Sequence, residues 1–380
     1  MNHYPDSRNG GIENVTRLLS CIFTELGHKV HIRYLYRTNF DHSDDSVFAS
    51  CEYLEWDNLE NEIKRIVRKS HIDVIVNRCV IIATPILRKA ISESGCKLIT
   101  TYNNKPTLAA RRVKEIWGDS TICILKKLVI LMSYPVYKQR SIKRLRESHR
   151  NSYQSSDALV LLSNQYTNEY VNLYNVDCEK ITIINNPIKS GLGITKTEFE
   201  NKEKIVLIVT RLDDEQKCVI KALKLWKSVS TNIPDWKLVI IGSGPDEDKI
   251  KNYNYVEKLS NIEFIRATDP TEYYKRSSIF LMTSRNEGWP NTLNEAMRYG
   301  CVPIVLATFS AIYDIIDNDI NGYIVEPNSY GNDLKNMQNI IINLTDNPDT
   351  MKSLALAAIE KTHRLSIENI IPQWLHIFNN

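Results

Sequence analysis

Two glutamates, Glu287 and Glu295, stand eight positions apart in the most informative stretch of this sequence. Glu287 lies in an expected loop after the apolar run 279–282, which has the pattern of a buried strand, and Gly288 and Pro290 keep that loop irregular. Glu295 lies about one turn into the helix expected next. Both carboxylates can therefore face one crevice at the carboxyl end of a strand, where open α/β sheets bind ligands.

Carboxylates in such a crevice can accept hydrogen bonds from hydroxyl groups, so one could bind a ribose and the other a sugar. The expected helix adds backbone N–H groups that suit phosphate or sugar oxygens, with Asn291 predicted as its N-cap. Leu293, Ala296 and Met297 form a narrow apolar stripe on this helix, and Gly300 ends it. The alternative is that both glutamates are solvated surface charges.

A second charged group surrounds a strand-to-helix turn. Arg211 and Lys217 follow the β-branched run 204–210 and precede a helix expected at 218–228. Arg211 can bind two oxygens with its planar fork, Lys217 is a point charge, and the helix N-terminus adds its dipole, so the turn suits a phosphate. The alternative is a set of surface ion pairs with the acidic residues 213–215.

The residues from Glu287 to Ile304 resemble the E-x7-E signature of GT4-type retaining glycosyltransferases. The resemblance implies an α/β protein of the GT-B fold, in which two Rossmann-like domains face a central cleft. It implies that Glu287 lies beside the donor sugar, that Glu295 binds the nucleotide ribose, and that Arg211 and Lys217 bind the donor diphosphate. The loop backbone that contacts sugar and phosphate then belongs to Gly288, Pro290, Asn291 and Thr292.

Three other places carry weaker matches to the family. Gly10 and Gly11 precede a helix, as does the family turn that faces the diphosphate, although the pair could be a plain tight turn. Asn103 stands where many members have a histidine; an amide can hold a sugar hydroxyl but cannot act as a base, and the alternative is a simple turn. Gly242, in a G-S-G-P turn, and Arg266, at a strand end, would border the base pocket.

Alternating helices and strands indicate parallel sheets with helical crossovers. We expect an N-terminal, acceptor-side domain at 1–190, a nucleotide-sugar-binding domain at 191–362, and a last helix at 363–380 that crosses back to the first domain. The boundary falls in a charged, glycine-bearing linker at 189–204. Only nine mostly polar residues precede Gly10, so the family's apolar first strand is either absent or lies upstream of the first residue.

Composition adds few constraints. A net charge of +3 gives no global sign of nucleic-acid binding. The eight cysteines are scattered without a C-x-x-C pair, so neither a zinc site nor a disulfide framework is indicated, and a reducing cytosol fits best. The G-S-G turn lacks the third glycine of a dinucleotide motif. Asp246 and Asp248 have D-x-D spacing but lie at an expected helix start, so we expect no metal. No apolar run is long enough to cross a membrane.

The segment 122–150 differs from the rest, because an apolar run is followed by many basic residues. This pattern is typical of contact with an anionic membrane surface, and the alternative is a solvated surface helix. We therefore expect a cytoplasmic protein with peripheral contact at the inner face of the membrane.

The predicted function is transfer of a hexose-type sugar, with retention, from a nucleotide diphosphate donor to a growing surface glycan that can be lipid-linked. The donor is uridine-linked by expectation and is a substrate, so no cofactor is predicted. The alternatives are a nucleotide-sugar epimerase of the same fold, a glycoside hydrolase using the two glutamates, and a non-catalytic partner subunit.

Overall fold

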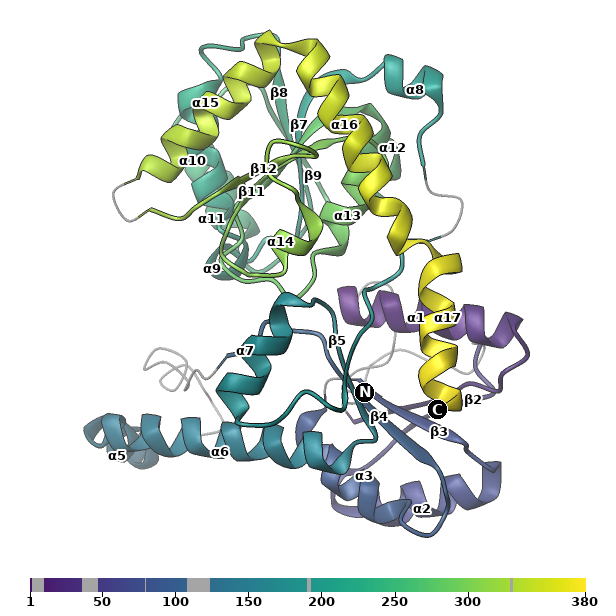
Figure 1. Ribbon diagram of the computed structural model, residues 1–380. Helices are drawn as coiled ribbons and strands as arrows, with labels where there is room; N and C mark the ends of the chain where they lie inside the picture. Colours follow the sequence, from purple (N-terminus) through teal and green to yellow (C-terminus); the bar gives the residue numbers. More distant parts are fainter. Residues whose placement is uncertain (2–9, 36–46, 79, 108–123, 190–192, 329–330) are drawn as a thin grey trace. The chain divides into compact units, whose positions relative to one another are not determined.

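The computed structural model describes residues 1, 10–35, 47–78, 80–107, 124–189, 193–328 and 331–380, and two compact units are present (Figure 1). The first unit comprises Met1–Ile184 together with His376–Asn380, and the second comprises Asn185–Leu375. Each unit is a parallel α/β structure, as the alternation of helices and strands predicts.

The second unit contains a six-stranded sheet in the order β12-β11-β10-β7-β8-β9, with every pair parallel. Its central strands are almost wholly apolar and buried, as expected for strands covered on both faces. The strands are β7 (Glu203–Val209), β8 (Lys237–Ile241), β9 (Ile262–Ile265), β10 (Ser277–Met282), β11 (Val302–Leu306) and β12 (Tyr323–Val325).

Helices cover both faces of this sheet (Figure 1). The chain moves from β7 toward β9 and then returns to β10 on the other side of β7, so right-handed crossovers place the two sets of connecting helices on opposite faces. Trp226 of α10 and Met337 of α15 belong to a core that packs against the sheet residues Leu238 and Ile279. The helices of the second unit are α8 (Lys196–Glu200), α9 (Asp214–Lys217), α10 (Val219–Val229), α11 (Glu247–Val256), α12 (Thr271–Arg276), α13 (Asn291–Arg298), α14 (Ile312–Ile315), α15 (Asn332–Asp346) and α16 (Pro348–Thr362), with a 3-10 turn, η3 (His363–Leu365). The last helix, α17 (Ile367–Asn379), begins in this unit, and its residues from His376 onward belong to the first unit.

The described strands of the first unit form two sheets. One is four-stranded and parallel, in the order β3-β4-β5-β6, and the other is the parallel pair β1-β2. The strands are β1 (His31–Tyr34), β2 (Ser50–Tyr53), β3 (Val74–Arg78), β4 (Lys97–Tyr102), β5 (Ala158–Leu161) and β6 (Ile181–Ile183). The helices are α1 (Gly11–Glu25), α2 (Leu59–Ser70), α3 (Thr84–Ala90), α5 (Ile124–Met132), α6 (Tyr134–Ser155) and α7 (Gln165–Tyr174), with 3-10 turns η1 (Trp56–Asn58) and η2 (Ile81–Ala83).

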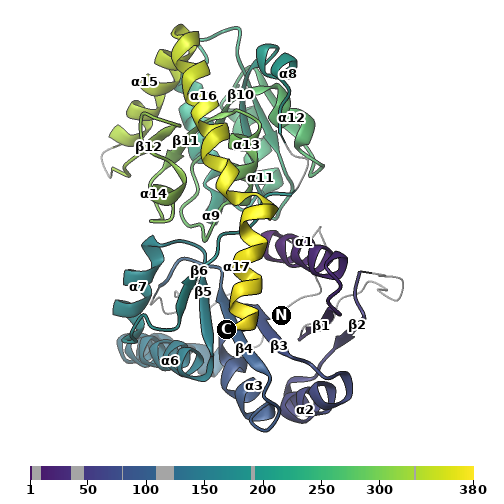
Figure 2. The same ribbon diagram turned by 45° about the vertical axis from the view of Figure 1, so that its right-hand side comes forward.

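The start of the chain lies between the two sheets of the first unit (Figure 2). The Met1 amino group donates to the Arg33 carbonyl over 2.9 Å, and the Leu35 N–H donates to the Met1 carbonyl over 3.2 Å. The predicted lack of a first strand before Gly10 concerns residues 2–9, which lie outside the described residues.

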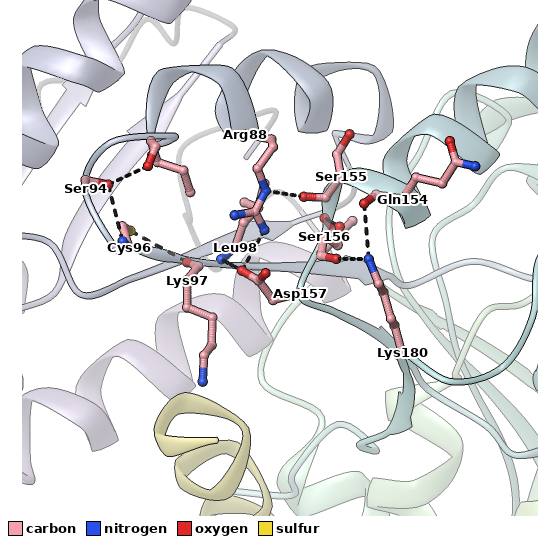
Figure 3. A network of polar contacts seen from close by, with 12 residues as sticks. Arg88, Ser94, Cys96, Lys97, Leu98, Gln154, Ser155, Ser156, Asp157 and Lys180 are labelled. Atoms are coloured by element: carbon pink, nitrogen blue, oxygen red, sulfur yellow. Dashed lines mark hydrogen bonds and ion pairs between the residues drawn. The ribbon is translucent and has the colours of Figure 1, made fainter.

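A polar network ties α3 to the amino ends of the first unit's strands (Figure 3). Arg88 pairs with Asp157 over 2.6 Å, and the same carboxylate accepts from the Leu98 N–H over 2.7 Å. Lys97 points to the other side in Figure 3, where its ammonium donates to the carbonyls of Ile377 and Phe378 over 3.3 and 3.2 Å. A cation at these last carbonyls satisfies the end of α17, so the last residues of the chain are held to the first unit.

Most predicted elements are confirmed: the apolar run 279–282 lies in β10, and the helix expected at 218–228 is α10, shifted by one residue. The segment 189–204, which we expected to be a linker, is corrected by the structure. It contains the helix α8, and its last two residues begin β7. Thr195 and Glu198 form a capping box, in which Thr195 accepts from the Glu198 N–H and Glu198 accepts from the Thr195 N–H. This S/T-x-x-E pattern is readable in the sequence.

Candidate functional site

In the sheet of the second unit, the order in which the chain connects the strands reverses between β7 and β10. These strands are neighbours, yet the chain leaves β7 toward β8 on one side and leaves β10 toward β11 on the other. Diverging connections leave a crevice at the carboxyl ends of the two strands, which is where ligands bind in open α/β sheets. Arg211 and Lys217 follow β7, and Glu287 follows β10.

Lys217 and Glu287 meet at this point. The Lys217 ammonium donates to Glu287 Oε1 over 2.7 Å, and the two side chains are only 17% and 10% exposed. The sequence indicated a role for each residue but gave no sign that they form an ion pair, because 70 residues separate them. Partial burial strengthens the attraction between the two charges and fixes the direction of the lysine.

Arg211 lies on the more open side of the same strand ends. Its Nη2 donates to Asp213 Oδ2 over 2.8 Å and to Gln216 Oε1 over 3.0 Å, while 58% of its side chain remains exposed. The surface ion pair that we considered for this turn is therefore present. An exposed pair of this kind contributes little energy, so an anion can compete with Asp213 for the guanidinium.

Gln216 connects the two loops, and no sequence pattern indicated it. Its side-chain amide accepts from Arg211 and donates to the Asn286 carbonyl over 3.1 Å, and its own carbonyl accepts from the Arg285 N–H over 2.7 Å. The turn after β7 and the loop after β10 are thus joined by direct hydrogen bonds beside Glu287.

The predicted capping role of Asn291 is wrong. Asn291 is the first residue inside α13 and Pro290 is the N-cap residue, so the Asn291 side chain cannot reach the free N–H groups of the first turn. Asn291 Oδ1 instead accepts from Asn186 Nδ2 over 3.0 Å, and Asn294 Nδ2 donates to the Pro290 carbonyl over 3.1 Å. Thr292 is half-buried. The apolar stripe and the helix end at Gly300, which has a φ of 72°, are as predicted.

Glu295 extends from α13 to a buried tyrosine. The Tyr274 hydroxyl donates to Glu295 Oε2 over 3.0 Å, and the Tyr274 ring stacks on Tyr299 with 5.8 Å between ring centres. Burial raises the pKa of the Glu295 carboxyl, and the hydrogen bond from Tyr274 lowers it in part. The sequence did not indicate Tyr274, because α12 was not predicted and the contact depends on how α12 packs beside α13.

Close backbone contacts explain why the G-S-G-P turn has glycine at positions 242 and 244. A Cβ at Gly242 would lie 1.9 Å from the Thr210 carbonyl oxygen, and one at Gly244 would lie 2.5 Å from the Leu212 carbonyl oxygen. The close approach lets the Leu212 N–H donate to the Ser243 carbonyl over 3.0 Å, so this turn supports the backbone beside Arg211. Arg266 follows β9 and is exposed.

Three predicted residues belong to the first unit. Gly10 is the N-cap residue of α1, with a φ of 145°, and Gly11 is its first residue. Asn103 directly follows β4 and is 6% exposed. Gly288, like the other loop residues discussed above, belongs to the second unit, where it is half-buried.

An aromatic cluster surrounds a buried histidine near Asn103. Tyr102 meets the His149 ring edge-on at 4.9 Å, and His149 stacks on Tyr174 at 3.9 Å with an angle of 5° between the rings. His149 Nδ1 lies 3.1 Å from the Tyr170 hydroxyl. Burial lowers the pKa of His149 to about 4, so the cluster is neutral at pH 7. The sequence gave no signal for this cluster, because its rings come from three separate elements.

Within the described part of the chain, no group of three or more His, Cys, Asp or Glu side chains could hold a metal ion. None of the described helices combines the length and the apolar character that crossing a membrane requires.

Two family models together match most of the chain. Residues 9–190 match Glycosyltransferase Family 4, and residues 194–360 match Glycosyl transferases group 1. Among curated relatives, the amylovoran biosynthesis glycosyltransferase AmsD of Erwinia amylovora is 32% identical over 185 residues, or 48% of this chain and 50% of that protein. The poly(glycerol-phosphate) alpha-glucosyltransferase of Bacillus subtilis is 29% identical over 176 residues, or 46% of this chain and 25% of that protein. The chain thus spans half or less of the length of these relatives.

Several solved structures match nearly the whole chain. Anabaena Alr3699/HepE in complex with UDP has a TM-score of 0.76 and 12% identity, covering 98% of this chain and 97% of its own. The apo form of the lipopolysaccharide outer core galactosyltransferase WaaB has a TM-score of 0.68 and 17% identity, covering 99% and 98%. These likenesses confirm the predicted fold with two Rossmann-like domains.

Proposed function

The chain belongs to the GT4-type glycosyltransferases of the GT-B fold, and from this premise we propose that it transfers a hexose-type sugar, with retention, from a nucleotide diphosphate donor to a growing surface glycan. The donor is a uridine diphosphate sugar, and the acceptor is carried on a lipid at the cytoplasmic face of the membrane.

The observation that carries the proposal is that two cations, Arg211 and Lys217, lie at the carboxyl ends of β7 and β10. Arg211 is more than half exposed, and Lys217 is fixed beside Glu287 by an ion pair of 2.7 Å. As the bond between the sugar and the diphosphate breaks, negative charge accumulates on the leaving diphosphate. Fixed cations directed at that charge lower the barrier without having to reorganise, which is a strong source of catalysis in enzymes.

The other residues act on the rest of the donor. Glu287 orients the sugar, with the backbone of Gly288 to Thr292 contacting sugar and phosphate oxygens, and Glu295 accepts hydrogen bonds from the ribose hydroxyls. Gly242 and Arg266 border the base. In the first unit, the proposal assigns Gly10 and Gly11 to the diphosphate and Asn103 to a sugar hydroxyl.

The names of the relatives support the substrate classes. AmsD is named for the biosynthesis of amylovoran, and the HepE structure contains UDP. A polysaccharide acceptor and a uridine-linked donor are therefore the first substrates to test.

The test is transfer from UDP-glucose, UDP-galactose and UDP-N-acetylglucosamine to extracted lipid-linked glycans, with the anomeric configuration of the product determined by NMR. The proposal expects a product with the configuration of the donor, and expects Glu287→Gln to lose most of the transfer while it stays folded. A product of inverted configuration contradicts retention.

Three rival activities predict different products in the same experiment. Release of an altered free sugar without an acceptor identifies an epimerase, and cleavage of a glycan without any donor identifies a hydrolase. A folded protein that neither transfers nor hydrolyses any donor is a non-catalytic partner subunit.

A further inference from the structure

Exposed apolar side chains gather on one short segment of the first unit. Of the thirteen large apolar side chains that are exposed in the described part of the chain, five lie between residues 124 and 136. They are Ile124 (69% exposed), Leu128 (44%), Val129 (63%), Met132 (87%) and Val136 (49%). The cluster is therefore a property of α5 and the start of α6, and it contrasts with the single exposed apolar residues that are normal on protein surfaces.

The spacing of these residues places them on the outer side of α5. Ile124, Leu128 and Met132 follow one another at intervals of four, so they form a stripe along one side of the helix. Tyr134 and Tyr137 stack with 6.1 Å between ring centres at the start of α6. Tyrosine rings with one apolar and one polar end are favoured where an apolar layer meets water.

The helix that follows is strongly cationic. α6 has six Lys and Arg residues and one carboxylate, Glu147, in a chain whose net charge is only +3. Five of the cations are exposed and precede Glu147: Lys138, Arg140, Lys143, Arg144 and Arg146. Val136, Arg140 and Lys143 share one side of α6, so the apolar stripe continues directly into a positive one. Figure 1 shows α5 beside the first turns of α6.

We propose that α5 and the first half of α6 form a docking surface for an anionic lipid bilayer. The apolar side chains of α5 enter the headgroup layer, and the cations of α6 bind lipid phosphates. The adjacent positive charge commits the surface to an anionic membrane, since an apolar protein partner would have no need of five exposed cations. No helix in the described ranges is long and apolar enough to cross a membrane. The surface lies outside the nucleotide site, and its test needs no enzymatic activity.

The experiment is sedimentation of the full chain with vesicles of phosphatidylcholine alone or of phosphatidylcholine mixed in equal parts with phosphatidylglycerol. We expect binding to the anionic vesicles that weakens with added salt, because salt screens the headgroup charge. Equal binding to both kinds of vesicle, or binding to neither, overturns the proposal.

Two double variants separate the two halves of the surface. Leu128→Asp with Met132→Asp should reduce vesicle affinity by about tenfold or more, since two apolar side chains no longer leave water. Arg140→Gln with Lys143→Gln should reduce it by about fivefold for each cation removed. The control is Tyr255→Asp with Val256→Asp, which removes an exposed apolar pair (81% and 64%) from α11 of the second unit and should bind vesicles as the parent does.

Further measurements keep the outcome specific. Each variant should keep the parent's thermal unfolding and its hydrolysis of a free nucleotide sugar, because the substituted side chains are exposed and lie outside the donor site. If the parent instead forms a dimer in ultracentrifugation, and Leu128→Asp with Met132→Asp abolishes the dimer while the parent ignores vesicles, the surface binds a second copy and the proposal is wrong.

Discussion

The two units use the same parallel α/β architecture but place different chemistry at their strand ends. In the second unit, the ends of β7 and β10 carry Arg211, Lys217 and Glu287, all in ion pairs. In the first unit, the end of β4 carries the neutral amide of Asn103, and the histidine nearby is buried among tyrosines with its pKa lowered to about 4. In the proposed function, the positive charge for a diphosphate donor therefore comes from the second unit.

The two regions also differ in role, because one is suited to bind a charged ligand and the other stabilises the fold. Partial burial of the charges at the strand ends of the second unit carries a desolvation penalty. A bound anion can offset part of this penalty. The aromatic cluster of the first unit has no charge at pH 7 to offer a substrate, and what it contributes is packing that fixes the end of β4. Three changes test this contrast.

The largest expected effect is on turnover in the second unit. Arg211→Ala should lower turnover by about 100- to 1,000-fold, or about 2 to 4 kcal/mol of transition-state stabilisation, because a cation directed at the leaving diphosphate is lost. Its folding should change little, since the Arg211 side chain is 58% exposed. Steady-state kinetics with thermal unfolding of the same sample measures both.

The matched control for that change is Arg276→Ala. Arg276 pairs with Glu203 at the amino ends of the same two strands, where its side chain is 44% exposed. It should leave turnover unchanged and cost about 0 to 1 kcal/mol of stability. Equal losses of turnover in Arg211→Ala and Arg276→Ala would contradict a special role for the carboxyl ends of β7 and β10.

The next effect concerns the stability of the first unit in acid. His149 has a pKa of about 4 in the folded protein and 6.5 when exposed, so the unfolded chain takes up its proton first as the pH falls. The stabilisation is complete above pH 6.5 and is lost as the pH falls toward 4, by about 3 kcal/mol at most. Urea unfolding at several pH values should show this slope, and His149→Gln should flatten it. An unchanged slope would mean that the buried histidine is not the titrating group.

The smallest effect concerns Glu295, the carboxylate that we propose binds the ribose. Tyr274→Phe removes the hydroxyl that donates to Glu295 over 3.0 Å, and a hydrogen bond to a charged group contributes about 1.5 to 3 kcal/mol. Uridine nucleotides should bind about tenfold more weakly or worse, while turnover at saturating donor stays near that of the parent.

The pH dependence distinguishes this positioning role from a loss of packing. The hydrogen bond from Tyr274 lowers the Glu295 pKa against the effect of burial, so the pKa should rise in Tyr274→Phe. Donor binding needs the carboxylate, and its loss in acid should therefore begin at a higher pH in the variant. Weaker binding with an unchanged pH profile would assign Tyr274 to packing alone.

Local patterns predicted most of the fold, because apolar runs and glycines report on the strands and turns that contain them. The positions of β10, α10 and the end of α13 follow from such patterns. The pairing of Lys217 with Glu287 and that of Tyr274 with Glu295 could not be predicted, since each depends on how distant segments pack. The error at Asn291 has a local origin, because a shift of one residue in the helix start moves the cap to Pro290.

The central claim is that the second unit binds the donor through its strand ends and α13. Calorimetric titration of uridine- and guanosine-linked sugars into the protein and into Glu295→Ala tests it most directly. The account predicts that a uridine-linked donor binds the parent and that Glu295→Ala loses this binding while it stays folded. Absence of binding to every donor, or equal binding to both proteins, would contradict it.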